Sequence, residues 1–316
     1  MKNPLVPNQN SLPAKKQPID PRSIELIQAG KSQRTRDLYS QNYNRFQEWA
    51  QEHQFPYLPT SAHALEQYLH HLIESDRKIA TIDLAIQSIK AIHQVTQQPF
   101  PAVPFLNEMM RGLKRTKGTK QRQAKPLTTD LIARGLSNEN TAMAIRDKAL
   151  ILISFAGALR RSEICELKFE DLDFRPEGLV LHLKKSKTDQ EAQGRDVPIH
   201  KSHNERMCPV LALQKWLRFA EIEDGCVFRS LRKGGYIRKN ITDGSISRIV
   251  KKVVSAAGED SRGYSGHSLR SGYVTEVARR GAQSHQIMMV TGHKSDAMVR
   301  KYIRSGRLFM DSISIL

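Results

Sequence analysis

A basic segment in the middle of the chain most constrains how the sequence can fold. Residues 111–125 read RGLKRTKGTKQRQAK and hold seven Lys and Arg residues with no acidic residue among them. Such a segment suits a linker better than a packed core, and the stretches on either side of it are each long enough for a domain. We therefore predict two domains within the 316 residues, joined by a basic linker at 114–126.

Apolar residues on the N-terminal side recur at helical spacing. The first predicted helix carries four of them at i, i+4, i+7 and i+11, namely Tyr39, Tyr43, Phe46 and Ala50. Leucine and isoleucine stripes predict two further helices, and residues 104–113 form a fourth, shorter pattern. Residues 1–20 lack this periodicity and are rich in Pro, Asn and Lys. We predict an all-α domain at 21–113, preceded by a flexible basic tail at 1–20.

The C-terminal side mixes helices with strands. Apolar residues alternate with period two at 178–185 and at 194–200, as in paired strands, and a polar hairpin loop joins them at 186–193. Further helices are predicted at 147–155, 161–167, 209–222, 244–257, 268–280, 283–290 and 296–302. The predicted fold class of this domain, residues 127–316, is α+β: mainly α with a small antiparallel β-sheet.

The charge balance indicates the kind of partner. Lys and Arg number 50 against 32 Asp and Glu, which leaves a net charge of +18 and predicts a polyanionic partner, most often nucleic acid. The three cysteines form no CxxC pair, which fits the cytoplasm and excludes a disulfide scaffold or a cysteine-based zinc module. The apolar runs fall short of the ~18–20 residues that a membrane span needs, so we expect a cytoplasmic protein with no membrane partner.

Two isolated cations in the C-terminal region stand at turns. Arg160 directly follows an apolar helix and precedes another, although a role for Arg160 and Arg161 in capping a helix C-terminus would explain them equally well. Lys187 lies in the polar hairpin loop, where a lysine is also the commonest kind of surface residue. Taken separately, neither residue indicates an active site.

Two later motifs place further polar residues at helix starts. His267 and Arg270 lie three apart in GHSLRSG, so their side chains would project together toward an anion that the helix dipole attracts. His293 opens a helix in TGHKS, and Tyr302 follows nine residues later. No metal-ligand spacing, Walker loop or GxSxG motif accompanies them. The pattern predicts chemistry on a phosphodiester with no metal and no other cofactor.

The order Arg, Lys, His-x-x-Arg, His and Tyr resembles the tyrosine recombinase (phage integrase) family. ALRRSE resembles the first arginine box of that family, SKTDQ its hairpin lysine, GHSLRSG its second box, and TGHKS with the later tyrosine its third. The resemblance covers most of the chain and implies a helical core-binding domain before a catalytic domain. It implies six catalytic residues and one supporting acid: Arg160, Lys187, His267, Arg270, His293 and Tyr302, with Glu163.

The resemblance also implies a role for each of these residues. Tyr302 would attack DNA to form a 3′-phosphotyrosyl link, while Arg160 and Arg270 clamp the phosphate. Lys187 would act as general acid at the departing 5′ oxygen, and His267 would assist proton transfer at the tyrosine. These roles suit the residue types, because a tyrosine with a pKa of ~10 needs help to ionise and arginines stabilise the extra negative charge of the transition state.

The resemblance implies two further roles, one of which has a competing interpretation. His293 would hydrogen-bond the phosphate, and Glu163 would orient the site, although Glu163 also reads as an ordinary surface acid of a helix. Because a covalent link to the enzyme conserves the bond energy, neither ATP nor a metal is expected.

The implied partner is double-stranded DNA with inverted-repeat recombination sites, bound by a homo-tetramer that joins two duplexes through a Holliday junction. Two other functions remain open at this point. A type IB topoisomerase would use the same residues as a monomer, but the helical N-terminal half and the apolar C-terminal tail disfavour it. A DNA-binding protein that has lost cleavage is disfavoured by the intact set of candidate catalytic residues.

Two surfaces are predicted to contact partners. Linker cations would lie along DNA phosphates, although a merely solvated linker has the same composition; they are Arg111, Lys114, Arg115, Lys117, Lys120, Arg122 and Lys125. The C-terminal tail carries five apolar residues among its last nine: Leu308, Phe309, Ile313, Ile315 and Leu316. We predict that this tail docks in trans on a neighbouring subunit, the alternative being that it folds back on its own domain.

Overall fold

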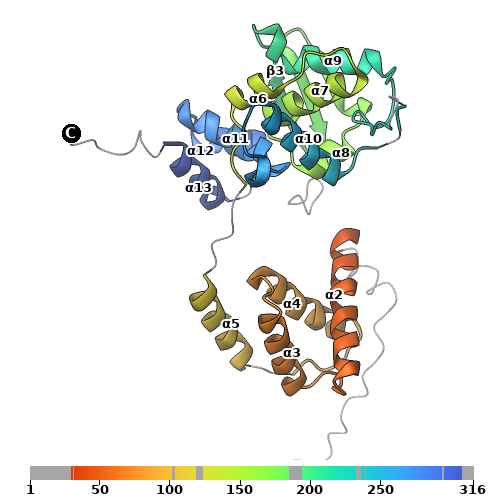
Figure 1. Ribbon diagram of the computed structural model, residues 1–316, viewed down its shortest axis with the longest axis vertical. Helices are drawn as coiled ribbons and strands as arrows, with labels where there is room; N and C mark the ends of the chain where they lie inside the picture. Colours follow the sequence, from red (N-terminus) through yellow and green to blue (C-terminus); the bar gives the residue numbers. More distant parts are fainter. Residues whose placement is uncertain are drawn as a thin grey trace, which may run out of the picture. The chain divides into compact units, whose positions relative to one another are not determined.

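The computed structural model describes residues 30, 32–101, 104–118, 124–184, 194–232, 236–238, 240–293 and 295–307. The chain divides into two compact units, Met1–Gln121 and Arg122–Leu316, and each is considered by itself (Figure 1). Several predicted features lie outside the described residues, namely the N-terminal tail at 1–20, Lys120, Arg122, Lys187 and the apolar C-terminal tail.

The first unit is helical throughout its described part. Its helices are α2 (Gln33–Glu52), α3 (Ala62–Glu74), α4 (Ile79–Val95) and α5 (Pro104–Lys117). Apolar stripes on α2, α3 and α4 meet in one core, where Phe46, Leu69 and Ile89 are fully buried. Ser61 begins α3, because its hydroxyl accepts a hydrogen bond from the backbone N of Ala64 at 3.1 Å and so satisfies a free helix donor.

Helix α5 is longer than the sequence pattern predicts. The helix expected at 104–113 continues to Lys117, so Lys114 and Arg115 lie in its last turns and not in a linker that begins at 114. Lys and Arg are good helix formers and interact favourably with the negative end of the helix dipole. Gly118 then adopts a φ of 70°, the left-handed conformation in which many helices end.

The second unit combines helices with one three-stranded sheet, which confirms the predicted fold class. Its helices are α6 (Thr129–Gly135), α7 (Ala142–Ala156), α8 (Arg161–Glu166), α9 (Pro209–Phe219), α10 (Asp243–Ala256), α11 (His267–Arg279), α12 (Ser284–Thr291) and α13 (Asp296–Arg307). The strands are β1 (Leu172–Arg175), β2 (Gly178–Leu183) and β3 (Arg195–His200), paired antiparallel in that order. The sequence pattern did not predict α6 or β1. In the register of β2 with β3, Leu183 lies opposite Arg195.

Two apolar clusters hold this unit together. The larger cluster gathers residues from α6, α7, α9, α10 and the inner face of β2 and β3, and includes the fully buried Trp216. A smaller, separate cluster joins α11, α12 and α13 through four buried residues, Val274, Ala278, Ile287 and Val299. Helix α13 therefore rests on the smaller cluster.

A glycine lets α11 lie close to the segment before α6. A Cβ on Gly272 would stand 2.0 Å from the carbonyl oxygen of Leu127, so any side chain there would force the two segments apart. The backbone N of Leu127 also donates to the carbonyl of Ser268 at 2.9 Å. These contacts hold the first turns of α11 in place. Among the described residues, no helix has the length and apolar character that a membrane crossing requires.

Candidate active site

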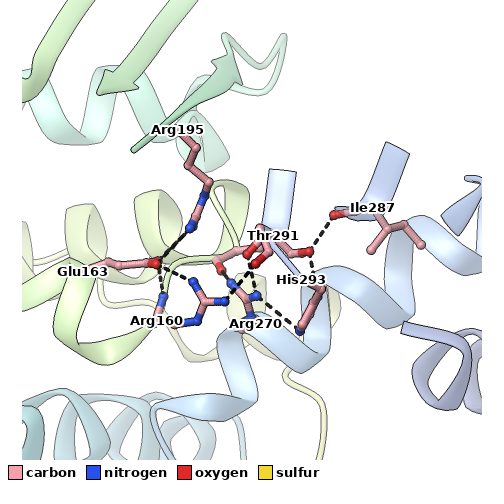
Figure 2. Close-up of polar contacts among 9 residues, drawn as sticks. Arg160, Glu163, Arg195, Arg270, Ile287, Thr291 and His293 are labelled. Atoms are coloured by element: carbon pink, nitrogen blue, oxygen red, sulfur yellow. Dashed lines mark hydrogen bonds and ion pairs between the residues drawn. The ribbon is translucent and has the colours of Figure 1, made fainter. Parts of the chain in front are cut away.

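Five of the six predicted catalytic residues and Glu163 meet in the second unit, at the N-termini of α8 and α11, in the turn after α12 and on α13. Figure 2 shows the arginines, the acid and His293 on converging elements. Lys187 is the sixth predicted residue, and it lies outside the described residues. The fold therefore brings together residues that the motifs singled out and that are spread along the sequence from Arg160 to Tyr302.

Glu163 is the acid around which one half of the site is built. Its side chain is 1% exposed, and it accepts hydrogen bonds from both the backbone N and Nη1 of Arg160, each at 2.7 Å. Arg195 donates to the same carboxylate from Nη1 and Nη2, each at 2.9 Å. Burial by itself would raise the pKa of Glu163, but the hydrogen bonds and charges of Arg195 and Arg160 outweigh burial and lower it. The carboxylate is therefore ionised, and the surface-acid interpretation of Glu163 is wrong.

Arg160 caps the start of α8 and also reaches a distant turn. Its Nη2 donates to the carbonyl oxygen of Gly292 at 3.1 Å. Gly292 ends α12 with a φ of 63°, a left-handed conformation that favours glycine. Arg160 precedes α8 as its N-cap, and the helix C-terminus that its side chain binds is that of α12, which lies far along the chain.

Arg270 is almost completely buried in the first turn of α11. Its guanidinium donates to the carbonyls of Ala158 at 2.7 Å and Thr291 at 2.5 Å, and contacts Nε2 of His293 at 3.2 Å. Burial and the nearby Arg160 lower the pKa of Arg270 to about 9, which leaves it protonated at neutral pH. A permanent cation is thus fixed at the centre of the site by backbone carbonyls.

The hydrogen-bond chain through Thr291 defines the tautomer of His293. Because a guanidinium can only donate, Nε2 of His293 accepts from Arg270 and the proton sits on Nδ1. Nδ1 then donates to Oγ1 of Thr291 at 2.7 Å, and that hydroxyl donates to the carbonyl of Ile287 at 2.7 Å. Burial, followed by the charges of Arg270 and Arg160, lowers the pKa of His293 to about 4. The imidazole is therefore neutral in this arrangement.

His267 and Tyr302 form the other half of the site. Nε2 of His267 lies 3.1 Å from the hydroxyl oxygen of Tyr302, which is half-buried on α13. Burial and then the charge of Arg270 lower the pKa of His267. Burial raises the pKa of Tyr302 against the opposing effect of Arg270. A neutral imidazole thus faces a protonated phenol, which is the pairing that proton transfer from the tyrosine requires.

Sequence reasoning missed two residues of this network, Arg195 and Thr291. Arg195 was hidden in a predicted strand, but it shares the side of β3 on which Val197 and Ile199 are buried. A charged residue on the inward face of a strand needs a partner, and that signal could have identified it. Thr291 lies two residues before His293, and nothing in its sequence context distinguishes it.

The predicted DNA-binding cations that the structure describes fall into two groups. On α5, Arg111 pairs with Glu108 at 2.6 Å and Lys117 with Asp76 at 2.8 Å, while Lys114 and Arg115 are exposed. In the second unit, Nζ of Lys125 lies 5.8 Å from the centre of the Tyr264 ring. In the part of the chain that the structure covers, no three His, Cys, Asp or Glu residues gather as a metal site would require.

Comparisons with known proteins identify the family. Residues 125–307 match the model of the phage integrase family. The chain is 35% identical over 294 residues to the integrase/recombinase xerD homolog of Selenomonas ruminantium, which covers 90% of this chain and 86% of that protein. Residues 265–282 resemble Cre recombinase in sequence, and recombinase cre of Escherichia phage P1 is 22% identical over 279 residues, or 81% of this chain and 80% of that protein.

A solved structure agrees with this assignment at the level of the fold. The Tn1549 transposon integrase, in complex with transposon right end DNA, matches with a TM-score of 0.61 at 18% identity, over 92% of this chain and 96% of that chain. The family match, the level of identity and the convergence of the predicted residues lead to one conclusion. The chain belongs to the phage integrase family of tyrosine recombinases, enzymes that cleave and rejoin DNA.

Proposed function

We propose that this recombinase acts on specific DNA sites with Tyr302 as its nucleophile. The Oη of Tyr302 attacks the scissile phosphorus, a bond forms between them, and the bond to the 5′ oxygen breaks. The product is a 3′-phosphotyrosyl link and a free 5′ hydroxyl, and attack by another 5′ hydroxyl reverses the step. The observation that carries the proposal is the 3.1 Å contact between Tyr302 and His267, beside the buried cation Arg270.

His267 takes the proton of the tyrosine in this scheme. Its lowered pKa keeps the imidazole neutral and able to accept at neutral pH, whereas the raised pKa of Tyr302 keeps the phenol protonated until the reaction begins. Lys187 returns a proton to the departing 5′ oxygen, the role that the family resemblance implies for it. The two acid–base groups thus serve opposite ends of the reaction.

Arg160 and Arg270 stabilise the negative charge that builds on the phosphate oxygens. Both guanidinium groups are already fixed by backbone carbonyls or by Glu163, so they need little reorganisation when the charge develops. His293 joins them as a hydrogen-bond partner of the phosphate. Its Nε2 accepts from Arg270 in the structure, so His293 can donate to the phosphate from this nitrogen only after it leaves that contact and gains a proton. Burial and then the charges of Arg270 and Arg160 lower the pKa of His293, and a bound phosphate opposes the effect of those charges.

The assembly that we propose is a homo-tetramer on two DNA duplexes with inverted-repeat sites, which exchanges strands through a Holliday junction. The apolar tail after Arg307 supports this, since it suits docking on a neighbouring subunit. The basic segment at 111–125 supports binding along the phosphate backbone, in particular the exposed Lys114 and Arg115 of α5. The complex of the similar Tn1549 transposon integrase with transposon right end DNA supports DNA as the partner.

A suicide DNA substrate tests the nucleophile. A nicked duplex carrying the inverted repeats that flank the encoding element traps the covalent adduct, because the cleaved fragment diffuses away. Wild-type protein is expected to form the adduct, whereas Tyr302→Phe should bind the DNA with similar affinity and form none, since only the hydroxyl is removed. An adduct that persists in Tyr302→Phe would show that another residue attacks.

A further inference from the structure

Arg195 is a buried arginine that the reaction scheme does not yet use. It is the first residue of β3, opposite Leu183 of β2, and its side chain is only 13% exposed. Its guanidinium lies on the side of the strand that otherwise carries buried apolar residues. An arginine in such a place costs stability unless it is paired. Among the described residues its buried Nε has no hydrogen-bond partner, whereas Nη1 and Nη2 both bind one acid, which indicates the purpose of the arginine.

That partner is Glu163, and Arg195 supplies half of its hydrogen bonds. An ionised carboxylate offers about four acceptor positions. The backbone N and Nη1 of Arg160 take one position on each oxygen, and Nη1 and Nη2 of Arg195 take another on each (Figure 2). These four donors fix the orientation of the carboxylate. The fixed carboxylate in turn holds the guanidinium of Arg160 in place.

The charges of the group also depend on Arg195. Glu163 paired with Arg160 alone would cancel the charge that Arg160 offers to a phosphate. Two arginines on one carboxylate leave one positive charge in excess, so Arg160 keeps its attraction for an anion. Arg195 thus allows Arg160 to be held by an acid without being neutralised by it.

Arg195 also lies against the turn that Arg160 contacts. A Cβ added to Gly292 would come within 2.8 Å of Nη1 of Arg195, so the arginine packs directly on this glycine. The carbonyl of the same glycine accepts from Nη2 of Arg160 at 3.1 Å. Arg195 therefore touches both groups that hold Arg160, the carboxylate and the turn before His293.

We propose that Arg195 is a positioning residue, which acts through Glu163 to hold Arg160 in place and to keep its positive charge available to the scissile phosphate. This inference rests on the proposed function of Arg160 in DNA cleavage. It predicts that the loss of Arg195 slows the chemical step and has little effect on DNA binding. It also predicts that the slowing is large only when Glu163 is present.

A mutant cycle with single-turnover kinetics tests the proposal. Adduct formation is measured at saturating suicide DNA for wild type, Arg195→Gln, Arg195→Lys, Glu163→Gln and the double variant Arg195→Gln/Glu163→Gln. The control is Arg175→Gln, which removes the same charge from an exposed arginine of β1 that pairs with Asp173. Melting temperatures and DNA dissociation constants are recorded for every variant.

The expected result is a first-order rate about 10²-fold lower in Arg195→Gln, as for a catalytic group displaced by about 1 Å, with an unchanged dissociation constant. Arg195→Lys should recover part of the rate, because lysine keeps the charge but loses the two-pronged geometry. In the Glu163→Gln background the same Arg195→Gln change should cost less than about threefold. An equal loss in both backgrounds would mean that Arg195 acts directly on DNA, and a lower melting temperature with an unchanged rate would mean a purely structural role. Either outcome overturns the proposal.

A second measurement does not depend on cleavage. In the NMR spectrum of the arginine side chains, the guanidinium of Arg160, assigned by its absence in Arg160→Lys, should show hindered rotation in wild type and faster averaging in Arg195→Gln. An unchanged Arg160 signal would overturn the positioning role. If wild-type protein forms no adduct, the proposed function fails, and this spectrum still decides whether Arg195 holds Arg160.

Discussion

The two halves of the active site are held in different ways. On the arginine side, Glu163 and Arg270 are almost completely buried, and each has several short hydrogen bonds to neighbouring elements. On the tyrosine side, a single described hydrogen bond joins Tyr302 to His267, and α13 rests on the small cluster that contains Val299. Under the proposed function, this difference would give a preorganised clamp for the phosphate and a nucleophile carried by a helix with few buried contacts.

The largest expected effect comes from breaking the arginine side. Arg160→Ala and Arg270→Ala should each lower the cleavage rate by on the order of 10²–10³ or more, since each removes a preorganised charged donor. Arg270→Ala should also lower the free energy of unfolding more than Arg160→Ala, because it leaves the buried carbonyls of Ala158 and Thr291 without a donor. Single-turnover cleavage and chemical denaturation measure the two effects. Rates within tenfold of wild type would show that these arginines do not stabilise the transition state.

His267 links the two halves, and its variant should have the next largest effect. His267→Gln should slow cleavage by about 10²-fold, the lower end of what proton transfer contributes. Because the pKa of His267 is lowered, the wild-type rate should fall only as pH drops below about 6.5, when the imidazole gains the proton that prevents it from accepting another. A pH–rate profile of both proteins checks this. If the rate of His267→Gln falls at low pH in the same way as that of wild type, the fall is caused by the protonation of another group.

A smaller effect is expected from weakening the support of α13. Val299→Ala removes two methyl groups from the small cluster, where the side chain is fully buried, and should cost on the order of 2 kcal/mol. Because that cluster is separate from the main core, the loss should be local. Hydrogen exchange should accelerate in α13 and remain unchanged in α7, whereas uniform acceleration in both helices would show that they unfold as one unit.

The last expected effect concerns stability against pH. The pKa of His293 falls from 6.5 in the unfolded chain to about 4 in the folded one. Between these values the unfolded chain binds a proton that the folded one does not, so the free energy of unfolding should decrease as pH falls from about 6.5 to about 4. Denaturant titrations across this range should show a shallower pH dependence in His293→Gln. An equal slope in both proteins would mean that the folded structure does not hold His293 neutral.

Much of this architecture could be predicted from the sequence, because its signals are local. Apolar stripes indicated the helices of the first unit, and alternation indicated β2 and β3. The motifs around Arg160, His267 and His293 indicated the site, since helix starts favour anion-binding groups. The elements β1 and α6 are too short for the apolar periodicity of a strand or a helix to be recognised in their sequences. The extension of α5 to Lys117 was not predicted, because the Lys and Arg residues at its end have the composition of a linker.

The partners of Arg195 and Thr291 could not be predicted from the sequence. Arg195 meets Glu163 across 32 positions, and its contact with Gly292 depends on how β3 packs against the turn after α12. Thr291 acts through its neighbour His293 and the carbonyl of Ile287. Such contacts arise from tertiary packing, which no spacing within a motif encodes.

In the proposed mechanism, the preorganised arginine side presents a phosphate to Tyr302 and to no other tyrosine. The direct measurement is mass spectrometry of the proteolysed covalent adduct from the suicide substrate. The DNA fragment should be attached through its 3′ phosphate to the peptide that contains Tyr302. Attachment to a peptide that contains Tyr264 or Tyr273, or to a 5′ phosphate, would contradict the proposed role of Tyr302.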